Sequence, residues 1–169
     1  MYAETEWKNN LQELHQESYL WSLTCCHFDE DLAKDVLQIV YLKIYEGKAI
    51  FSNKSSLKTW LFSVIRFTSI DAMRKIRKQT LQLNNHHQWI AETEQFAESP
   101  DKQLFTKILQ TLSGQQREVL TLAFYHDLTL EEIAALMKLS IGSVRTHYSR
   151  GKDNFKKLLS VYKMNNDLI

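Results

Sequence analysis

Apolar residues recur along most of the chain at the three- and four-residue spacing that is typical of amphipathic helices. In the first half this pattern predicts three helices, over residues 5–27, from Asp29 to the stop signal at Gly47, and over residues 57–78. Asp29 opens an acidic run that suits the positive N-terminal end of a helix. The second half predicts four further helices, over about residues 101–112, 114–125, 129–136 and 140–160.

Residues 79–100 interrupt this pattern with an amide-rich, weakly periodic segment. The chain has only four glycines and one proline, which favours helices joined by short turns over a sheet protein. We therefore expect an all-α protein with two small helical domains, residues 1–80 and 104–169, joined by a flexible linker over residues 81–103.

Two helices of the second domain predict a helix-turn-helix within residues 129–157. Thr129 and Glu132 have the spacing of a capping box, and Ser140 can cap the second helix. Ala134 is small where the two helices must approach each other. Apolar or small residues recur on one side of the second helix and predict its buried face: Val144, Tyr148, Gly151, Phe155 and Leu158.

The opposite side of that helix carries Arg145, Thr146 and Ser149, with Arg150 at its edge and Lys152 nearby. Arg can bond a guanine edge through two hydrogen bonds, Thr and Ser can bond bases or phosphates, and Arg150 and Lys152 suit phosphates. The pattern predicts a recognition helix for the major groove of DNA. A generic amphipathic helix pair is the alternative, and it does not explain the capping box together with the basic outward face.

Charge is segregated along the chain, although its net value is only +1. Residues 1–50 hold four Lys or Arg against nine Asp or Glu, whereas residues 51–80 hold seven against one and residues 141–169 hold six against two. Such segregation predicts two contacts with a polyanion and at least one surface for another partner.

The predicted helix over residues 57–78 combines aromatic rings with cations. Unstacked bases can stack on exposed rings while Lys and Arg meet the phosphates, so this composition suits melted DNA. The cations at the C-terminal end also complement the helix dipole, and burial of Trp60 and Phe67 in a core is an equally good interpretation. The cations are Lys58, Arg66, Arg74, Lys75, Arg77 and Lys78.

Other kinds of site find little support. Cys25-Cys26-His27 has no second cluster at zinc-like spacing, so we interpret these cysteines as small apolar residues of a helix, kept as thiols in a reducing compartment. The N-terminal residues do not form a secretory signal and no apolar run reaches the roughly 18 residues of a membrane span, so we expect a cytoplasmic protein. We find no paired carboxylates at metal spacing, phosphate-binding Gly loop or Ser/His/Asp arrangement, so we expect no metal, no cofactor and no enzyme such as a nuclease or recombinase.

The order of these features resembles the sigma subunits of bacterial RNA polymerase, in the small extracytoplasmic-function group, over nearly the whole chain. An ordinary helix-turn-helix regulator with an N-terminal sensing domain would account for the second half only. The matching segments are residues 33–38, 41, 45, 56–61, 70–71, 74–78, 112–117, 128–134 and 142–150.

The resemblance implies that the first domain binds the start-proximal promoter element and the second domain the upstream element. It implies core RNA polymerase as a partner: Asp35, Gln38 and Ile39 would dock on the β′ clamp helices, and the second domain would rest on the β flap. Members of the group are commonly held inactive by an anti-sigma factor. Ile39 replaces a usual Glu, Phe67 a usual Asn and Ser113 a usual Pro, which makes the docking surface less acidic and affects polar DNA contacts at position 67.

The resemblance also assigns DNA contacts. The loop over residues 51–56 and the following helix would capture a flipped base and help to melt the duplex. The start-proximal residues are Phe51, Asn53, Lys58, Trp60, Arg66, Phe67, Arg74 and Arg77, and the upstream-element residues are Ser143, Arg145, Thr146, Ser149, Arg150 and Lys152.

Overall fold

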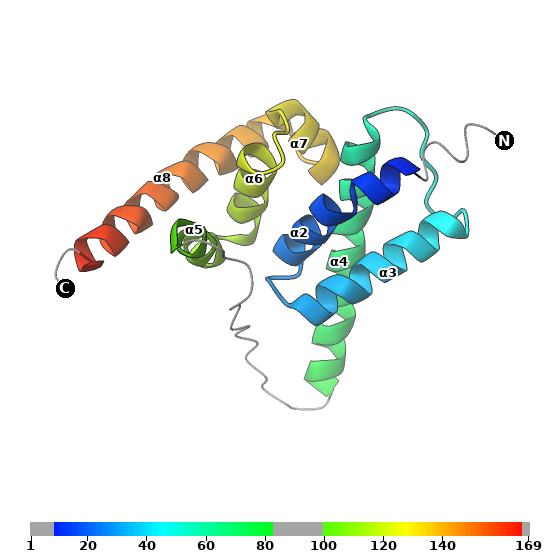
Figure 1. The fold of residues 1–169 in the computed structure, drawn as a ribbon, viewed down its shortest axis with the longest axis horizontal. Coiled ribbons are helices and arrows are strands. Elements are labelled where there is room, and N and C mark those ends of the chain that lie inside the picture. The colour runs from blue at the N-terminus through cyan, green and yellow to red at the C-terminus, as the bar shows by residue number, and fades with distance from the viewer. Residues whose placement is uncertain (1–8, 83–99, 167–169) are drawn as a thin grey trace. The chain divides into compact units, whose positions relative to one another are not determined.

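A computed structural model describes residues 9–82 and 100–166 of the protein. The described residues form α-helices and turns, with no strand among them, which confirms the all-α expectation (Figure 1). The chain divides into two compact units, residues 1–91 and residues 92–169. We describe each unit by itself.

Unit 1 contains three packed helices: α2 (His15–Cys25), α3 (Glu30–Tyr45) and α4 (Leu57–Gln82). Each of the three contacts the other two, and Figure 1 shows α2 and α3 running across α4. Residues 9–13 are also helical, and a turn at Leu14 separates them from α2. The single helix predicted over residues 5–27 is therefore interrupted at Leu14 and ends at Cys25, while residues 5–8 lie outside the described residues.

The core of unit 1 is organised around Trp21, whose side chain is fully buried. Its indole ring stacks on Phe62 with 5.9 Å between ring centroids, and its Nε1–H donates a hydrogen bond of 3.0 Å to the Phe62 carbonyl oxygen. Ser22, also fully buried, donates from Oγ to the carbonyl oxygen of Ala33 at 3.0 Å. Helix α2 is thus joined to α4 and α3 by these two buried hydrogen bonds as well as by apolar contacts.

Helix α3 begins after Asp29 and ends before Gly47, as the sequence predicts. Asp29 is the N-cap, and its Oδ1 accepts a hydrogen bond of 2.9 Å from the backbone N–H of Leu32. The helix ends at Tyr45, and Gly47 follows with φ +69°, a conformation that glycine adopts without steric penalty.

Helix α4 is longer than the sequence pattern predicted, because it continues beyond residue 78 to Gln82. Residues 79–82 contain no helix-breaking residue, and Thr80 donates from its hydroxyl to the Ile76 carbonyl oxygen at 3.0 Å. The polar composition of this stretch indicated a linker, but polar residues extend a helix readily on its solvent side. Most of the predicted linker, residues 83–99, lies outside the described residues.

Unit 2 contains α5 (Pro100–Thr111), α6 (Gly114–Phe124), α7 (Leu130–Met137) and α8 (Ile141–Asn166). Helix α5 begins at Pro100, a first-turn position that proline tolerates. Helix α8 runs six residues beyond the predicted end at residue 160. The core of unit 2 contains fully buried side chains from each of its four helices: Ile108, Leu122, Ile133 and Val144.

Helices α6 and α8 approach closely at Gly151. A Cβ atom at this position would lie 3.2 Å from Cγ and Cδ1 of Leu120, closer than most side-chain contacts in proteins. The absence of a side chain at Gly151 therefore sets the distance between these two helices.

Cys25 and Cys26 are both buried at the end of α2, and neither forms a disulfide. The Cys26 sulfur lies 3.7 Å from the hydroxyl oxygen of Ser69 on α4. Burial raises the pKa of the Cys26 thiol from its ordinary value of 9.0 to about 11. The interpretation of both cysteines as small core residues is confirmed.

We predict that Gly151→Val lowers the free energy of unfolding of unit 2 by about 1–3 kcal/mol, because the branched side chain overpacks against Leu120. All four tryptophans lie in residues 1–91, so tryptophan fluorescence follows unit 1 while far-UV circular dichroism follows both units during urea unfolding. Gly142→Ala is the control, since a Cβ there has its nearest neighbour at 4.0 Å and should leave unit 2 at least as stable. Equal loss in both variants would contradict the packing argument.

We also predict that Cys26 resists alkylation at pH 8 in the folded protein, because a thiol with a pKa near 11 is almost entirely protonated there and is shielded from the reagent. Iodoacetamide labelling followed by mass spectrometry should give fast reaction only in denaturant. Rapid labelling of Cys26 under native conditions would show that the end of α2 opens in solution.

Candidate nucleic-acid interface

The helix-turn-helix of unit 2 is held in register by caps on both of its helices. The capping box predicted at the start of α7 is present: Glu132 N–H donates to Thr129 Oγ1 at 3.2 Å, and Thr129 N–H donates to Glu132 Oε2 at 2.8 Å. Ser140 caps α8, because its Oγ accepts from Ser143 N–H at 3.1 Å. Lys138 forms the turn in the left-handed conformation, with φ +55°.

The predicted inner face of α8 packs inward as expected. Val144 is fully buried and Gly151 is buried, while the larger side chains are half-buried. Tyr148 stacks on Phe124 with 5.7 Å between centroids, and Phe155 meets Phe105 at 5.2 Å. These contacts prevent α8 from rotating about its own axis, so its outward face is fixed.

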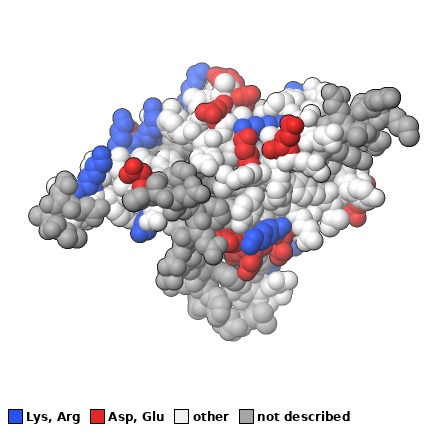
Figure 2. Space-filling model, in the orientation of Figure 1, with Lys and Arg blue, Asp and Glu red and all other residues white. Residues whose placement is uncertain are grey.

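That outward face exposes Arg145, Thr146, Ser149 and Arg150. Arg145 Nη2 lies 3.7 Å from Oε1 of Glu131 on α7, and both side chains are more than 60% exposed. Figure 2 shows Lys and Arg side chains following the length of α8. The exposed cations of this helix are Arg145, Arg150, Lys156, Lys157 and Lys163.

Three predicted polar residues of α8 have local partners in this structure. Thr146 donates to the Gly142 carbonyl oxygen at 2.9 Å, and Ser143 Oγ lies 2.8 Å from Ser140 Oγ. Lys152 is half-buried, with its ammonium nitrogen 4.4 Å from the centroid of the Tyr148 ring. Ser143 and Lys152 are therefore less available than Arg145 and Ser149.

In unit 1, Phe51 and Trp60 form an aromatic pair at the start of α4. Their ring centroids are 5.3 Å apart and both side chains are half-buried. Asn53, in the loop between them, is exposed with φ +57°. The sequence left the burial of Trp60 open, and the structure shows that Trp21, not Trp60, fills the core. The burial of Trp21 was not predicted from the sequence, because two serines share the same buried face of α2.

The prediction that Arg66 contacts DNA is not supported, because its side chain lies inside unit 1. Arg66 is only 8% exposed, and its guanidinium carbon lies 5.5 Å from the centroid of the Phe67 ring. It falls one helical turn after Phe62 and three residues before Ser69, both fully buried. The basic composition of α4 could not reveal which of its cations share the buried face.

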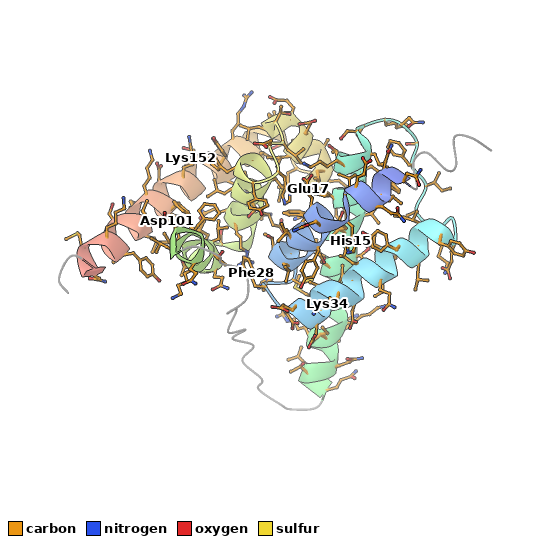
Figure 3. The ribbon with its side chains drawn as sticks, in the orientation of Figure 1. His15, Glu17, Phe28, Lys34, Asp101 and Lys152 are labelled. Carbon is orange, nitrogen blue, oxygen red and sulfur yellow. The ribbon has the colours of Figure 1, made fainter. Side chains whose placement is uncertain are left out.

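Lys58 also contacts other side chains of unit 1. Its ammonium nitrogen lies 2.5 Å from Oε2 of Glu17, which projects from α2 (Figure 3), and its side chain is 25% exposed. It also lies 5.7 Å from the centroid of the Phe62 ring. Lys58 therefore joins α2 to the start of α4, and this contact leaves it poorly placed for a phosphate.

The far part of α4 does present cations to solvent. Arg74 and Arg77 are exposed, Phe67 is half-buried, and Arg74 Nη1 lies 3.7 Å from Oδ1 of Asp71. Of the eight residues predicted for the start-proximal element, Arg66 is buried and Lys58 is paired with Glu17, and the other six are half-buried or exposed: Phe51, Asn53, Trp60, Phe67, Arg74 and Arg77.

Asp35, Gln38 and Ile39 are exposed together on one face of α3, as a partner-binding surface requires. Leu42 and Tyr45 are apolar or aromatic, but they are 51% and 83% exposed and continue the same face of the helix. Neither Leu42 nor Tyr45 was predicted from the sequence to contact a partner. The available signal was that α3 has more apolar residues than one buried stripe needs.

Unit 2 also has an open apolar hollow of about 250 Å³ that the sequence did not predict. It is formed where α5, α6 and α8 meet, and Phe124 at its edge is 56% exposed. Two lysines join the apolar side chains around it, and its lining is Phe105, Leu120, Phe124, Phe155, Lys152 and Lys156.

Two classes of site lack support within the described residues. No group of three His, Cys, Asp or Glu side chains there could hold a metal ion. In the same part of the chain, no helix has the length and apolar character to cross a bilayer.

Comparison with known proteins matches both units. The family model Sigma-70 region 2 matches residues 18–79, and Sigma-70, region 4 matches residues 102–154. The chain is 29% identical over 133 residues to RNA polymerase sigma factor YlaC of Bacillus subtilis, which covers 75% of this chain and 77% of that protein. It is 26% identical over 144 residues to ECF RNA polymerase sigma factor SigX of the same organism, covering 80% and 74%.

A solved structure is also similar. The sigma factor RpoE in complex with the anti-sigma factor NepR, from Bartonella quintana, matches with a TM-score of 0.80 and 26% identity. The match covers 92% of this chain and 98% of that chain.

Proposed function

The chain belongs to the sigma-70 family of RNA polymerase sigma factors, in the extracytoplasmic-function group, and from this premise we propose that it directs core polymerase to a specific set of promoters and assists strand opening. Sigma factors are initiation factors and not enzymes in themselves, so the bond chemistry belongs to the polymerase. The observation that carries the proposal is the presence, in one chain, of a basic recognition helix in unit 2 and an aromatic and basic helix in unit 1.

Unit 2 would read the upstream promoter element with the outward face of α8. The exposed guanidinium of Arg145 can bond the O6 and N7 atoms of a guanine, and Thr146 and Ser149 can bond neighbouring bases. Arg150 and the other exposed cations of α8 would contact phosphates and set the register of the helix. The packing of Val144 and Gly151 supports this role by holding the reading face outward.

Unit 1 would act on the start-proximal element. The Phe51–Trp60 pair offers partly exposed rings on which an unpaired base can stack, next to the exposed amide of Asn53. Arg74 and Arg77 would hold the backbone of the opened strand. Arg66 is assigned instead to the interior of unit 1, and Lys58 to the ion pair that joins α2 to the start of α4.

Core polymerase would bind through both units. The face of α3 that carries Asp35, Gln38 and Ile39 would dock on the β′ clamp helices, and the exposed side chains of Leu42 and Tyr45 would extend the contact with apolar area. The apolar hollow of unit 2, with Lys152 and Lys156 beside it, would receive an apolar side chain of the β flap. In this role the protein works in the cytoplasm.

An anti-sigma factor is proposed as a further partner. The similar solved structure is of a sigma factor bound to an anti-sigma factor, and the exposed apolar side chains of α3 and of the hollow in unit 2 are surfaces that such a partner could cover. Occupying either surface would compete with polymerase.

The proposal is tested by run-off transcription with core polymerase and a promoter library, with and without this chain. We expect strong transcription from a defined subset of promoters only when the chain is present. Arg145→Ala should remove about 1–3 kcal/mol of discrimination at one base pair, the contribution of a bidentate Arg–guanine contact. Binding to core polymerase should not change, whereas Asp35→Ala should weaken it. Absence of promoter-dependent stimulation would refute the function.

Trp60→Ala should impair opening of the promoter rather than its recognition. Loss of one stacking surface should destabilise the open complex by about 1–3 kcal/mol, measured as permanganate reactivity of unpaired thymines. Trp60→Phe keeps a ring against Phe51 and should retain most of the activity. An equal fall in closed-complex binding would show that Trp60 has a structural role instead.

A further inference from the structure

An ion pair joins the two helices of the helix-turn-helix at the base-reading position. Glu131, in the first turn of α7, places Oε1 3.7 Å from Nη2 of Arg145 on α8. The neighbouring residue, Glu132, forms the capping box with Thr129. Glu131 is not part of the capping box, and its carboxylate lies beside the guanidinium.

We propose that Glu131 is a specificity-determining residue that acts through Arg145, which rests on the proposed role of α8 in reading the upstream element. A guanidinium has five N–H donors, so Arg145 can keep Glu131 on one side and bond a guanine with others. Guanine O6 and N7 are neutral acceptors, whereas a phosphate is an anion that the nearby carboxylate repels. Glu131 thus disfavours phosphate binding by Arg145 more than guanine binding, which raises the ratio of specific to non-specific affinity.

The exposure of both side chains determines whether the ion pair affects folding or DNA binding. At 3.7 Å, with side chains 65% and 69% exposed, the pair contributes little to folding because water and salt screen it. Removing the carboxylate should therefore leave unit 2 folded. A DNA phosphate that approaches Arg145, by contrast, meets the carboxylate within one Debye length, about 8 Å at physiological salt.

Asp153, the acidic residue on the outward side of α8, is too far from Arg145 to act in the same way. Asp153 is exposed but lies eight residues after Arg145, about 12 Å along the axis at 1.5 Å per residue. The effect is thus assigned to the carboxylate that reaches across from α7.

The test compares Glu131→Gln with the unaltered chain in complex with core polymerase. Binding is measured on duplexes that carry the selected upstream element, on duplexes with each base of that element changed, and on unrelated sequence, over a range of salt concentrations. We expect affinity for unrelated DNA to rise roughly threefold to tenfold, with a salt dependence steeper by about 0.9, as for one added phosphate contact. Discrimination at the base read by Arg145 should fall by a similar factor.

Two further variants separate this effect from changes in folding or in overall charge. Glu131→Asp keeps the charge but shortens the side chain, and should give an intermediate loss of discrimination. Asp101→Asn removes one negative charge from the first turn of another helix of unit 2, α5, and should leave discrimination unchanged (Figure 3). Circular dichroism verifies that each variant is folded.

The double variant Glu131→Gln, Arg145→Ala decides whether Glu131 acts through Arg145. We expect Glu131→Gln to have no further effect once Arg145 is absent. A full effect in that background, or unchanged discrimination in Glu131→Gln alone, would overturn the inference while leaving the proposed function intact. If Arg145→Ala itself leaves base selection unchanged, the reading role of α8 is wrong and the inference fails with it.

Discussion

The contact of Trp21 with Phe62 determines how unit 1 presents its surface. The stacked ring and the hydrogen bond to the Phe62 carbonyl oxygen fix α2 against the first half of α4. Once that face of α4 is buried, Arg66 must lie inside with it, because it is one helical turn further along. Trp60 lies on the opposite side of α4 from Phe62 and is half-buried, whereas Arg74 and Arg77 are exposed in the second half of the helix. The buried aromatic contact thus accounts for the burial of Arg66 among the cations of α4.

Unit 2 depends on a corresponding constraint. Val144 and Gly151 form the tightly packed side of α8, and a Cβ atom at position 151 would lie only 3.2 Å from Leu120, closer than most side-chain contacts. Because α8 cannot rotate, Arg145 is held on the outer side, where Glu131 can approach it. Helix α8 thus packs tightly with one face and presents Arg145 on the opposite face, as a recognition helix requires.

Local signals were read correctly from the sequence where a few neighbouring residues decide the outcome. The capping box of Thr129 and Glu132 and the N-cap at Asp29 involve partners three residues apart, and the inner face of α8 follows from the spacing of its own apolar residues. The misses concern residues whose environment depends on another helix. Leu42 and Tyr45 have the apolar character of core residues but find no neighbouring helix in the described part of unit 1 to cover them, and Lys58 has the character of a DNA contact but meets Glu17.

The sequence by itself determined that the chain is helical, that its second half carries a helix-turn-helix, and that its basic residues are concentrated in two segments. These properties follow from helical periodicity, capping chemistry and composition, all of which act between near neighbours in the chain. Only the tertiary structure decided which aromatic residue fills the core, which cations remain available, and that a carboxylate of α7 lies beside Arg145. Those outcomes depend on the rotation of each helix about its axis, and that rotation is set by packing between segments far apart in sequence.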